Sequence, residues 1–227
     1  MKTITIIDTT LCREDSTFSF KERIEIARLL ERLHVDVIEL PEIDNPKTDI
    51  LLVRTVSPFV KQAELSVAAG SSMESVENAA AALSAATKGC IRIELPVSPV
   101  GMEYTCHKKA PKMLEWIAQT VSAAKASCNT VEFCAVDATR AEPDFLQAAI
   151  ETAVKAGATR IAVCDSAADM MPDDFAAFVE TVTAQAGVPV TVRCNDKNGM
   201  ACAQAMLAVR HGAAGMKTAV GGATTSL

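Results

Sequence analysis

Aromatic residues and histidines are scarce in this sequence of 227 residues, and it has no excess of positive charge. Aromatic side chains make up 4% of it, with one Trp and one Tyr, and there are three histidines. Lys and Arg number 22 against 28 Asp and Glu, which gives a net charge of -6 and an isoelectric point near 5.2. A surface that binds nucleic acid needs a basic footprint, so this class of partner is not expected.

Signals of export and of membrane insertion are also missing. The N-terminus, MKTITIID, reaches an acidic residue without the basic start, long apolar core or cleavage site of a signal peptide. No run approaches the ~18 apolar residues of a membrane span. The eight cysteines form no C-x-x-C pair, and most lie in apolar segments. We expect reduced thiols in a cytoplasmic protein with no membrane contact, rather than disulfides or a zinc site.

What the sequence does contain is a regular alternation of short β-branched runs with longer, Ala-rich segments. In the segment 21–33, for example, Ile24, Ala27 and Leu30 are spaced for one face of a helix. The predicted strands cover residues 3–8, 35–40, 63–69, 90–97, 130–136, 160–165, 189–194 and 215–220.

This alternation predicts an α/β fold with a parallel sheet, and about eight units favour a closed (β/α)8 TIM barrel as one domain over residues 1–227. Neither G-x-G-x-x-G nor G-x-x-x-x-G-K-[ST] is present, which removes the main support for an open nucleotide-binding sheet. Only seven residues follow the last predicted strand, so the eighth helix is predicted to be missing. The uncovered strands then predict a homo- or hetero-oligomer, unless the sequence is a trimmed piece of a longer protein.

The active sites of such barrels lie at the carboxyl ends of the strands. Carboxylates recur at the predicted strand ends and the loops after them. This ring suits either a hard divalent cation or a mouth closed by ion pairs with arginines. The candidates are Asp8, Glu39, Glu64, Glu94, Asp137 with Thr139 and Arg140, Asp165, Arg193, and Lys217.

The chain resembles the homocitrate and isopropylmalate synthases in six segments, which follow in order over nearly its whole length. These synthases belong to the metal-dependent barrels of the pyruvate carboxyltransferase and hydroxymethylglutaryl-CoA lyase type. The resemblance implies a barrel in which Mg, Mn or Zn holds a 2-oxo acid while acetyl-CoA adds to its carbonyl carbon. The segments are DTTL (8–11), FSFKERIEIARLLERLHVDVIEL (18–40), SPVGMEY (98–104), VEFCAVDATRAEPDFL (131–146), CDSAADMMPDDF (164–175) and NGMACAQAMLAVRHGA (198–213).

The family's opening motif, D-T-T-L-R-[DE]-G-E-Q, is altered here to DTTLCREDS. In the family, the Arg stabilises enolate charge and the following acid binds the metal. Without a gap, Cys12 takes the Arg position and Arg13 the acid position. With one inserted residue, Arg13 and Glu14 regain both roles, but Asp15 replaces the Gly.

The family's paired histidines, H-x-H-N-D at the end of the seventh strand, are also absent. The chain reads VRCND there, so a gapless match puts Arg193 and Asn195 at the two positions. A match that keeps Asn-Asp together puts Val192 and Cys194 there instead. The remaining metal candidates are therefore Glu14, Cys194, Asn195 and Asp196.

Other family positions have changed in the same direction. A His before M-E-Y is Gly101, a catalytic Glu is Val136, and an Asn in strand eight is Val220. A Glu-Arg pair that follows matches Thr224 and Thr225. The histidines that the chain does have, His34, His107 and His211, are expected on the surface.

These losses predict a homologue that is inactive alone and acts as a partner subunit, or as a binder of a small anionic ligand on Arg13, Arg140, Arg193 or Lys197. Asp8, Glu39, Asp137, Thr139, Asp165 and Arg193 are then candidates for ligand binding. The alternative is an active enzyme that condenses or cleaves acyl-CoA, with Arg13, Glu14, Arg140 and Lys217 as its catalytic candidates. It requires either a rebuilt metal site or Lys217 as a Schiff-base nucleophile, with a pKa depressed by burial.

Overall fold

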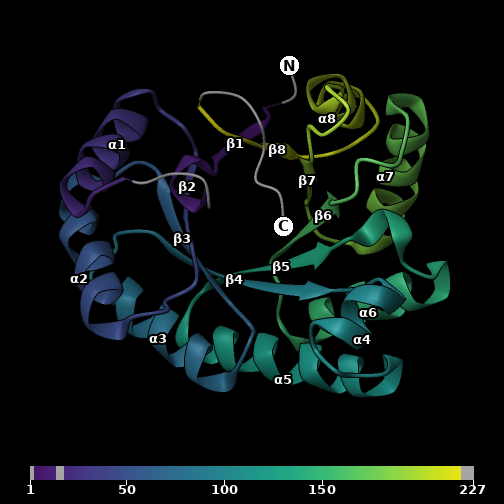
Figure 1. The fold of residues 1–227 in the computed structure, drawn as a ribbon, viewed down its shortest axis with the longest axis horizontal. Coiled ribbons are helices and arrows are strands. Elements are labelled where there is room, and N and C mark those ends of the chain that lie inside the picture. Colours follow the sequence, from purple (N-terminus) through teal and green to yellow (C-terminus); the bar gives the residue numbers. More distant parts are fainter. Residues whose placement is uncertain (1–2, 14–17, 221–227) are drawn as a thin grey trace.

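The computed structural model describes residues 3–13 and 18–220. Eight parallel strands form a closed barrel in chain order, with helices outside it (Figure 1). The strands are β1 (Thr5–Asp8), β2 (Val37–Leu40), β3 (Glu64–Ala69), β4 (Gly89–Pro96), β5 (Thr130–Val136), β6 (Arg160–Asp165), β7 (Val190–Cys194) and β8 (Gly215–Thr218). The predicted (β/α)8 barrel is confirmed.

The barrel closes where β8 pairs with β1, with Thr5 opposite Gly215 and Asp8 opposite Thr218. Close approach of the two backbones requires a glycine at this point, because a Cβ on Gly215 would collide with the carbonyl oxygen of Thr5.

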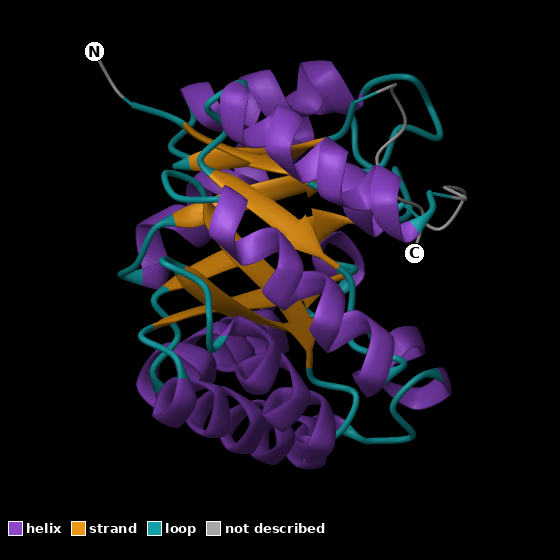
Figure 2. Ribbon diagram, turned by 90° about the vertical axis from the view of Figure 1, so that its left-hand side faces the viewer, coloured by secondary structure: helices purple, strands orange, loops and turns teal. Residues whose placement is uncertain are grey.

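The described residues contain eight α-helices, of which α4 and α5 belong to the same crossover between β4 and β5. Figure 2 shows the helices packed around the strands. The predicted lack of a helix after β8 falls on residues 221–227, which lie outside the described part. The helices are α1 (Phe20–Arg32), α2 (Pro46–Val56), α3 (Met73–Leu83), α4 (Pro99–Tyr104), α5 (Ala110–Ser127), α6 (Pro143–Ala156), α7 (Pro172–Ala186) and α8 (Ala201–Arg210).

Local sequence explains where several helices begin and end. At the start of α1, Ser19 and Glu22 form a reciprocal capping box. Helix α6 begins with Pro143 and ends at Gly157, whose φ of 114° suits a glycine after the last turn. None of the described helices is long and apolar enough to cross a membrane.

Side chains on the two faces of the barrel wall differ sharply in polarity. Since successive residues of a strand point to opposite faces, β4 sends Ile91 and Ile93 outward, where both are fully buried under helices. The residues between and after them, Arg92 and Glu94, point inward. The apolar core therefore lies between strands and helices, and the inside of the barrel is polar.

Candidate functional site

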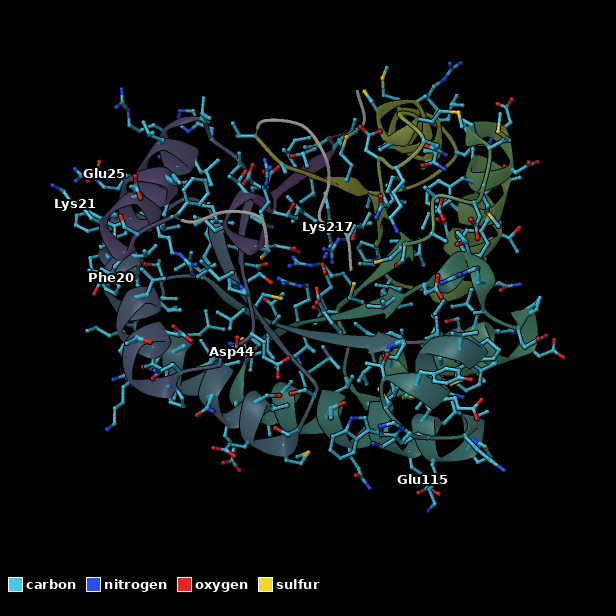
Figure 3. The ribbon with its side chains drawn as sticks, in the orientation of Figure 1. Phe20, Lys21, Glu25, Asp44, Glu115 and Lys217 are labelled. Atoms are coloured by element: carbon cyan, nitrogen blue, oxygen red, sulfur yellow. The ribbon has the colours of Figure 1, made fainter. Side chains whose placement is uncertain are left out.

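The inside of the barrel holds a continuous network of ion pairs. Lys217, which lies among the side chains that fill the barrel (Figure 3), is at its centre. Its Nζ donates to Glu39 Oε1 at 2.6 Å and also to Glu132 Oε1. All three side chains are at most 1% exposed. Burial opposes the charged ammonium, but the two glutamates outweigh it and raise the pKa of Lys217 above its usual value.

The expected depressed pKa of Lys217 is therefore wrong. Burial alone would favour the neutral amine, but β2 and β5 each bring a glutamate to within hydrogen-bond distance. A Schiff-base nucleophile must be unprotonated to attack a carbonyl. In this arrangement Lys217 is a buried cation paired with two glutamates.

Toward the carboxyl ends of the strands, Arg92 and Arg193 enclose Glu94. Arg92 Nε donates to Glu94 Oε1 at 2.6 Å, and Arg193 Nη1 lies 3.6 Å from the same oxygen. Arg92 also contacts Glu39 at 3.5 Å and donates to Ser66 Oγ at 3.2 Å. Burial would raise the pKa of Glu94, but the two guanidinium groups lower it to about 2.

Toward the amino ends of the strands, Arg160 is the last cation of the network and pairs with Glu132 and Glu64. Its Nε donates to Glu132 Oε2 and its Nη2 to Glu64 Oε1, both at 2.6 Å. Glu64, expected at the rim with the catalytic residues, is instead the first residue of β3 and lies at the opposite end of the barrel.

The network balances its charge. Four cations face four carboxylates, and every carboxylate has at least one cation within 4.0 Å: these are Arg92, Arg160, Arg193 and Lys217, with Glu39, Glu64, Glu94 and Glu132. Sequence reasoning did not assign Arg92, Glu132 or Arg160. For Arg92 and Glu132 the available signal was a charged residue flanked on both sides by buried apolar residues within a strand. Arg160 follows Thr159 as the first residue of β6 and gives no such signal.

At the rim, Asp165 at the end of β6 is fully buried and well bonded. Its Oδ1 accepts from Thr139 Oγ1 at 3.0 Å, and its Oδ2 accepts from Gln204 Nε2 at 2.9 Å. The structure thus brings together the predicted Asp165 and Thr139, and adds Gln204 from α8. Neutral donors, rather than Arg193 or Lys197, make the hydrogen bonds to this carboxylate.

The other predicted rim residues make hydrogen bonds close to their own positions in the barrel. Arg140 binds Asp137 through both carboxylate oxygens, at 2.8 and 2.7 Å, and is half exposed to solvent. Asp8 Oδ1 accepts from the Thr10 backbone N–H at 2.9 Å, and burial raises the pKa of the Asp8 carboxyl. Arg13 Nη1 donates to the carbonyl oxygen of Val220 at 3.0 Å.

Asn195, directly after β7, carries a buried donor without an acceptor. Its backbone N–H continues the strand ladder to Asp165 O at 3.2 Å, and its Oδ1 accepts from the Lys197 backbone N–H at 3.0 Å. The side chain is 5% exposed, yet no acceptor within the described residues reaches its Nδ2. Arg193 lies two residues earlier, so both side chains belong to the inward face.

The described residues do not fit the metal that the resemblance implies. A shared metal needs several oxygen, nitrogen or sulfur ligands converging on one point, and no group of three or more His, Cys, Asp or Glu does so in residues 3–13 and 18–220. Asp196 Oδ1 instead accepts from the Ala201 backbone N–H at 3.0 Å, and burial raises the pKa of Cys194. Glu14, Thr224 and Thr225 lie outside the described part.

The predicted surface histidines and free thiols are confirmed within the described residues. His34, His107 and His211 are all exposed, and His211 pairs with Glu180 at 2.9 Å. All eight cysteines are free.

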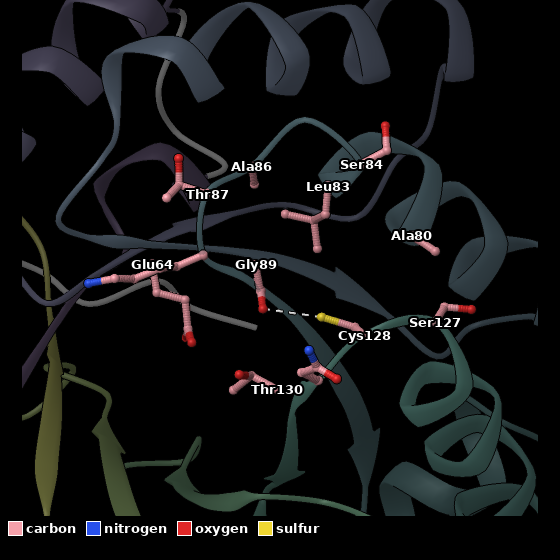
Figure 4. A pocket seen from close by; sticks show the side chains of 12 residues that line it. Glu64, Ala80, Leu83, Ser84, Ala86, Thr87, Gly89, Ser127, Cys128 and Thr130 are labelled. Carbon is pink, nitrogen blue, oxygen red and sulfur yellow. Dashed lines mark hydrogen bonds between the residues drawn. The ribbon is translucent and has the colours of Figure 1, made fainter.

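A cavity of about 520 Å³ lies at the amino ends of β3 to β5, away from the mouth (Figure 4). Glu64, Gly89 and Thr130, the first residues of these strands, help to line it. Cys128 Sγ donates to the Gly89 carbonyl oxygen there at 3.1 Å. The cavity contains none of the predicted site residues except Glu64, so we place the candidate site at the opposite, carboxyl end.

Fold and site together define a closed parallel βα-barrel with a charged, internally paired interior. The sequence model of the HMGL-like family matches residues 3–224, and the chain belongs to this family. It is 33% identical over 225 residues to a 2-isopropylmalate synthase of Aquifex aeolicus, covering 96% of this chain and 43% of that protein. A 2-isopropylmalate synthase of Caulobacter vibrioides is 30% identical, with the same coverage. The chain thus spans less than half the length of these relatives.

Solved structures agree on the fold. The HMG-CoA lyase of Bacillus subtilis superposes with a TM-score of 0.84 at 16% identity, covering 100% of this chain and 80% of that one. The carboxyl transferase domain of Rhizobium etli pyruvate carboxylase gives 0.72 at 13% identity, covering 96% and 40%. These two proteins share the barrel with this chain.

Proposed function

We propose that the mouth of the barrel binds a small carboxylate, held by Arg193 and Asn195 of the β7 end, and that the chain alone does not carry out metal-dependent acyl-CoA chemistry. The observation that carries the proposal is the buried Asn195 Nδ2, which meets no acceptor among the described residues. A buried donor left without an acceptor costs roughly 1–3 kcal/mol. A ligand carboxylate would remove this cost.

The surrounding charges limit the size of the anion. Arg193 supplies a nearly buried guanidinium on the same inward face, which suits a carboxylate. Glu94, however, already contacts this group at 3.6 Å, and the interior has no net charge. A polyanion would meet repulsion from Glu94, so we infer a ligand with one or two carboxylates, such as a 2-oxo acid.

Calorimetric titration of the chelator-treated protein with 2-oxoglutarate tests the proposal. Asn195→Asp keeps the acceptor that bonds to Lys197 but replaces the donor with a charged oxygen, so we expect at least about tenfold weaker binding. Asn129→Asp is the matched control, because Asn129 is exposed at the opposite end of the barrel. Absence of binding to the unmodified protein at millimolar ligand, or equal binding by both variants, would contradict the proposal.

Membership of the HMGL-like family favours a second candidate function, the condensation or cleavage of an acyl-CoA on a rebuilt metal site. Glu14, Cys194 and Asp196 would be its ligand candidates. Acetyl-CoA consumption with a 2-oxo acid, abolished by chelator and restored by Mn²⁺, would establish this activity and refute the first proposal. Ligand binding that is unchanged by Mn²⁺, without acetyl-CoA consumption, would support the first.

We further propose that the chain works with a second copy or a different subunit, as the outer side of β8 and β1 is less well covered than the other strands. Met216 and Ile6 there are partly exposed, whereas outward residues elsewhere, such as Ile91 and Phe133, are fully buried. Light scattering on the purified protein tests this. A stable monomer at all concentrations would contradict self-association, and failure to co-purify any partner would contradict a hetero-oligomer.

A further inference from the structure

Two cysteines on neighbouring strands face each other inside the barrel. Cys134 of β5 and Cys164 of β6 have their Sγ atoms 3.3 Å apart, within hydrogen-bond distance. Both side chains are buried, at 0% and 1% exposure. With Ala162 they form a small cluster separate from the main core. Neither the proposed ligand site nor the ion-pair network needs a thiol at these positions.

The surroundings of the pair lower the pKa of Cys164. Cys134 and Cys164 share a hydrogen bond, and its effect, together with the positive charges of Arg193 and Lys217, lowers the pKa of Cys164 although burial opposes this. The same hydrogen bond and burial raise the pKa of Cys134. A thiolate beside a thiol is the arrangement from which disulfides form after oxidation.

We propose that Cys134 and Cys164 are an oxidisable dithiol, which hydrogen peroxide converts to a disulfide joining β5 and β6. The Cys164 thiolate attacks one peroxide oxygen, the O–O bond breaks, and the Cys164 sulfenic acid and hydroxide result. Cys134 then loses its proton to this hydroxide, which becomes the first water, and attacks the Cys164 sulfur. The S–O bond breaks and releases a second hydroxide. This hydroxide takes up the proton that left Cys164 when its thiolate formed, which gives the second water. Two thiols and one peroxide thus give one disulfide and two waters, with two electrons passing to the peroxide.

The two sulfurs are already close, and the strand register makes their link diagonal. They must approach from 3.3 Å to the bonded length of about 2.05 Å. Because Cys134 lies opposite Ala162, Cys164 is two residues further along β6, so the disulfide would cross the strand pair diagonally and its closure would move the backbone as well as the sulfurs. Because β5 and β6 lead into Asp137 and Asp165, a covalent link between them acts directly beneath the rim. This inference does not depend on the proposed ligand.

The test is to treat the folded, unmodified protein with hydrogen peroxide, quench, unfold, alkylate free thiols and map the peptides by mass spectrometry. We expect a peptide pair joined through Cys134 and Cys164, two hydrogens lighter than the reduced pair and separated again by dithiothreitol. Oxidation of Cys202, the exposed cysteine of α8, shows that the peroxide was active. Cys90 is buried and makes no hydrogen bond to another cysteine among the described residues, so it should still react with the alkylating reagent after unfolding.

Two results would overturn the inference. One is full alkylation of both Cys134 and Cys164 in a sample in which Cys202 has been oxidised. The other is a disulfide that joins Cys134 to some other cysteine in the unmodified protein. A Cys164→Ala variant should lose the linked peptides without gaining another link. If that variant fails to fold, the result with the unmodified protein still decides.

Discussion

Replacing Lys217 with Met should be among the most destabilising single changes in this protein. Among the described residues, Lys217 is the one cation that contacts both Glu39 and Glu132. After the substitution, Arg92 remains 3.5 Å from Glu39 and Arg160 remains 2.6 Å from Glu132. Breaking a buried ion pair by deleting one partner costs about 3–5 kcal/mol. Total stabilities of about 5–15 kcal/mol are usual, so the loss should be a large fraction of the free energy of unfolding.

The stability loss caused by Lys217→Met should depend on pH. In the unmodified protein Glu132 has a pKa lowered to about 2, because Lys217 and Arg160 outweigh burial. Its contribution to stability is therefore present above the unfolded pKa of about 4.3 and is lost as pH falls toward 2. Without Lys217, the pKa of Glu132 in the folded protein rises, and the ionised carboxylate destabilises the folded state. The deficit of Lys217→Met should then be largest near pH 7 and shrink toward pH 5.

Urea unfolding at pH 5, 6 and 7 measures the effect. Lys155→Met is the matched control, because Lys155 is 77% exposed and pairs only with Glu151, so its loss should stay within about 0.5 kcal/mol. A double variant, Lys217→Met with Glu132→Leu, restores the charge balance and should recover at least about 2 kcal/mol. A deficit no larger than that of the control, or one that does not change between pH 5 and 7, would refute the reasoning.

Two further predictions concern positions outside the network. The Glu31 carboxylate accepts three hydrogen bonds from the backbone N–H groups of residues 61–63, at 2.9, 2.7 and 3.1 Å. Glu31→Gln should therefore lower the free energy of unfolding, measured in urea, by about 1–2 kcal/mol. Glu25→Gln on the same helix is the control and should change it little. At Gly101 a Cβ would lie 2.6 Å from the Pro96 Cβ, so Gly101→Ala should cost about 1–3 kcal/mol. Gly89→Ala, whose Cβ would have ordinary contacts at 3.4 Å, is its control, and equal midpoints for the two alanine variants would contradict the steric argument.

The barrel could be predicted from the sequence because each strand has a recognisable local pattern of β-branched residues. The predicted strands 130–136 and 160–165 coincide with β5 and β6, and the others differ by one or two residues at an end. The ends of β1 and β2, at Asp8 and Leu40, coincide with the predicted strand ends. Local periodicity contains this information, and the order of the strands around a parallel barrel then follows from short right-handed crossovers.

The ion-pair network could not be predicted in the same way, because its partners are far apart in the sequence. Lys217 and Glu39 are separated by 178 residues, and Arg160 and Glu64 by 96. The sequence places Lys217 and Glu39 at predicted strand ends but does not show that they pair. Their burial depends on the register of neighbouring strands, in which Lys217 lies opposite Ile7 and inside the barrel.

The network also bears on whether the barrel mouth can hold a divalent cation. A divalent cation in the barrel mouth requires carboxylates with unneutralised charge, but Glu39 and Glu94 here are already paired with Lys217, Arg92 and Arg193. Under the gapless match, Arg193 stands at an expected histidine position, and its guanidinium supplies positive charge to Glu94. Restoring one histidine alone would therefore leave the remaining carboxylates neutralised. Recovery of a metal site would require removing cations as well as adding ligands, which explains physically why single reversions should have little effect on metal affinity.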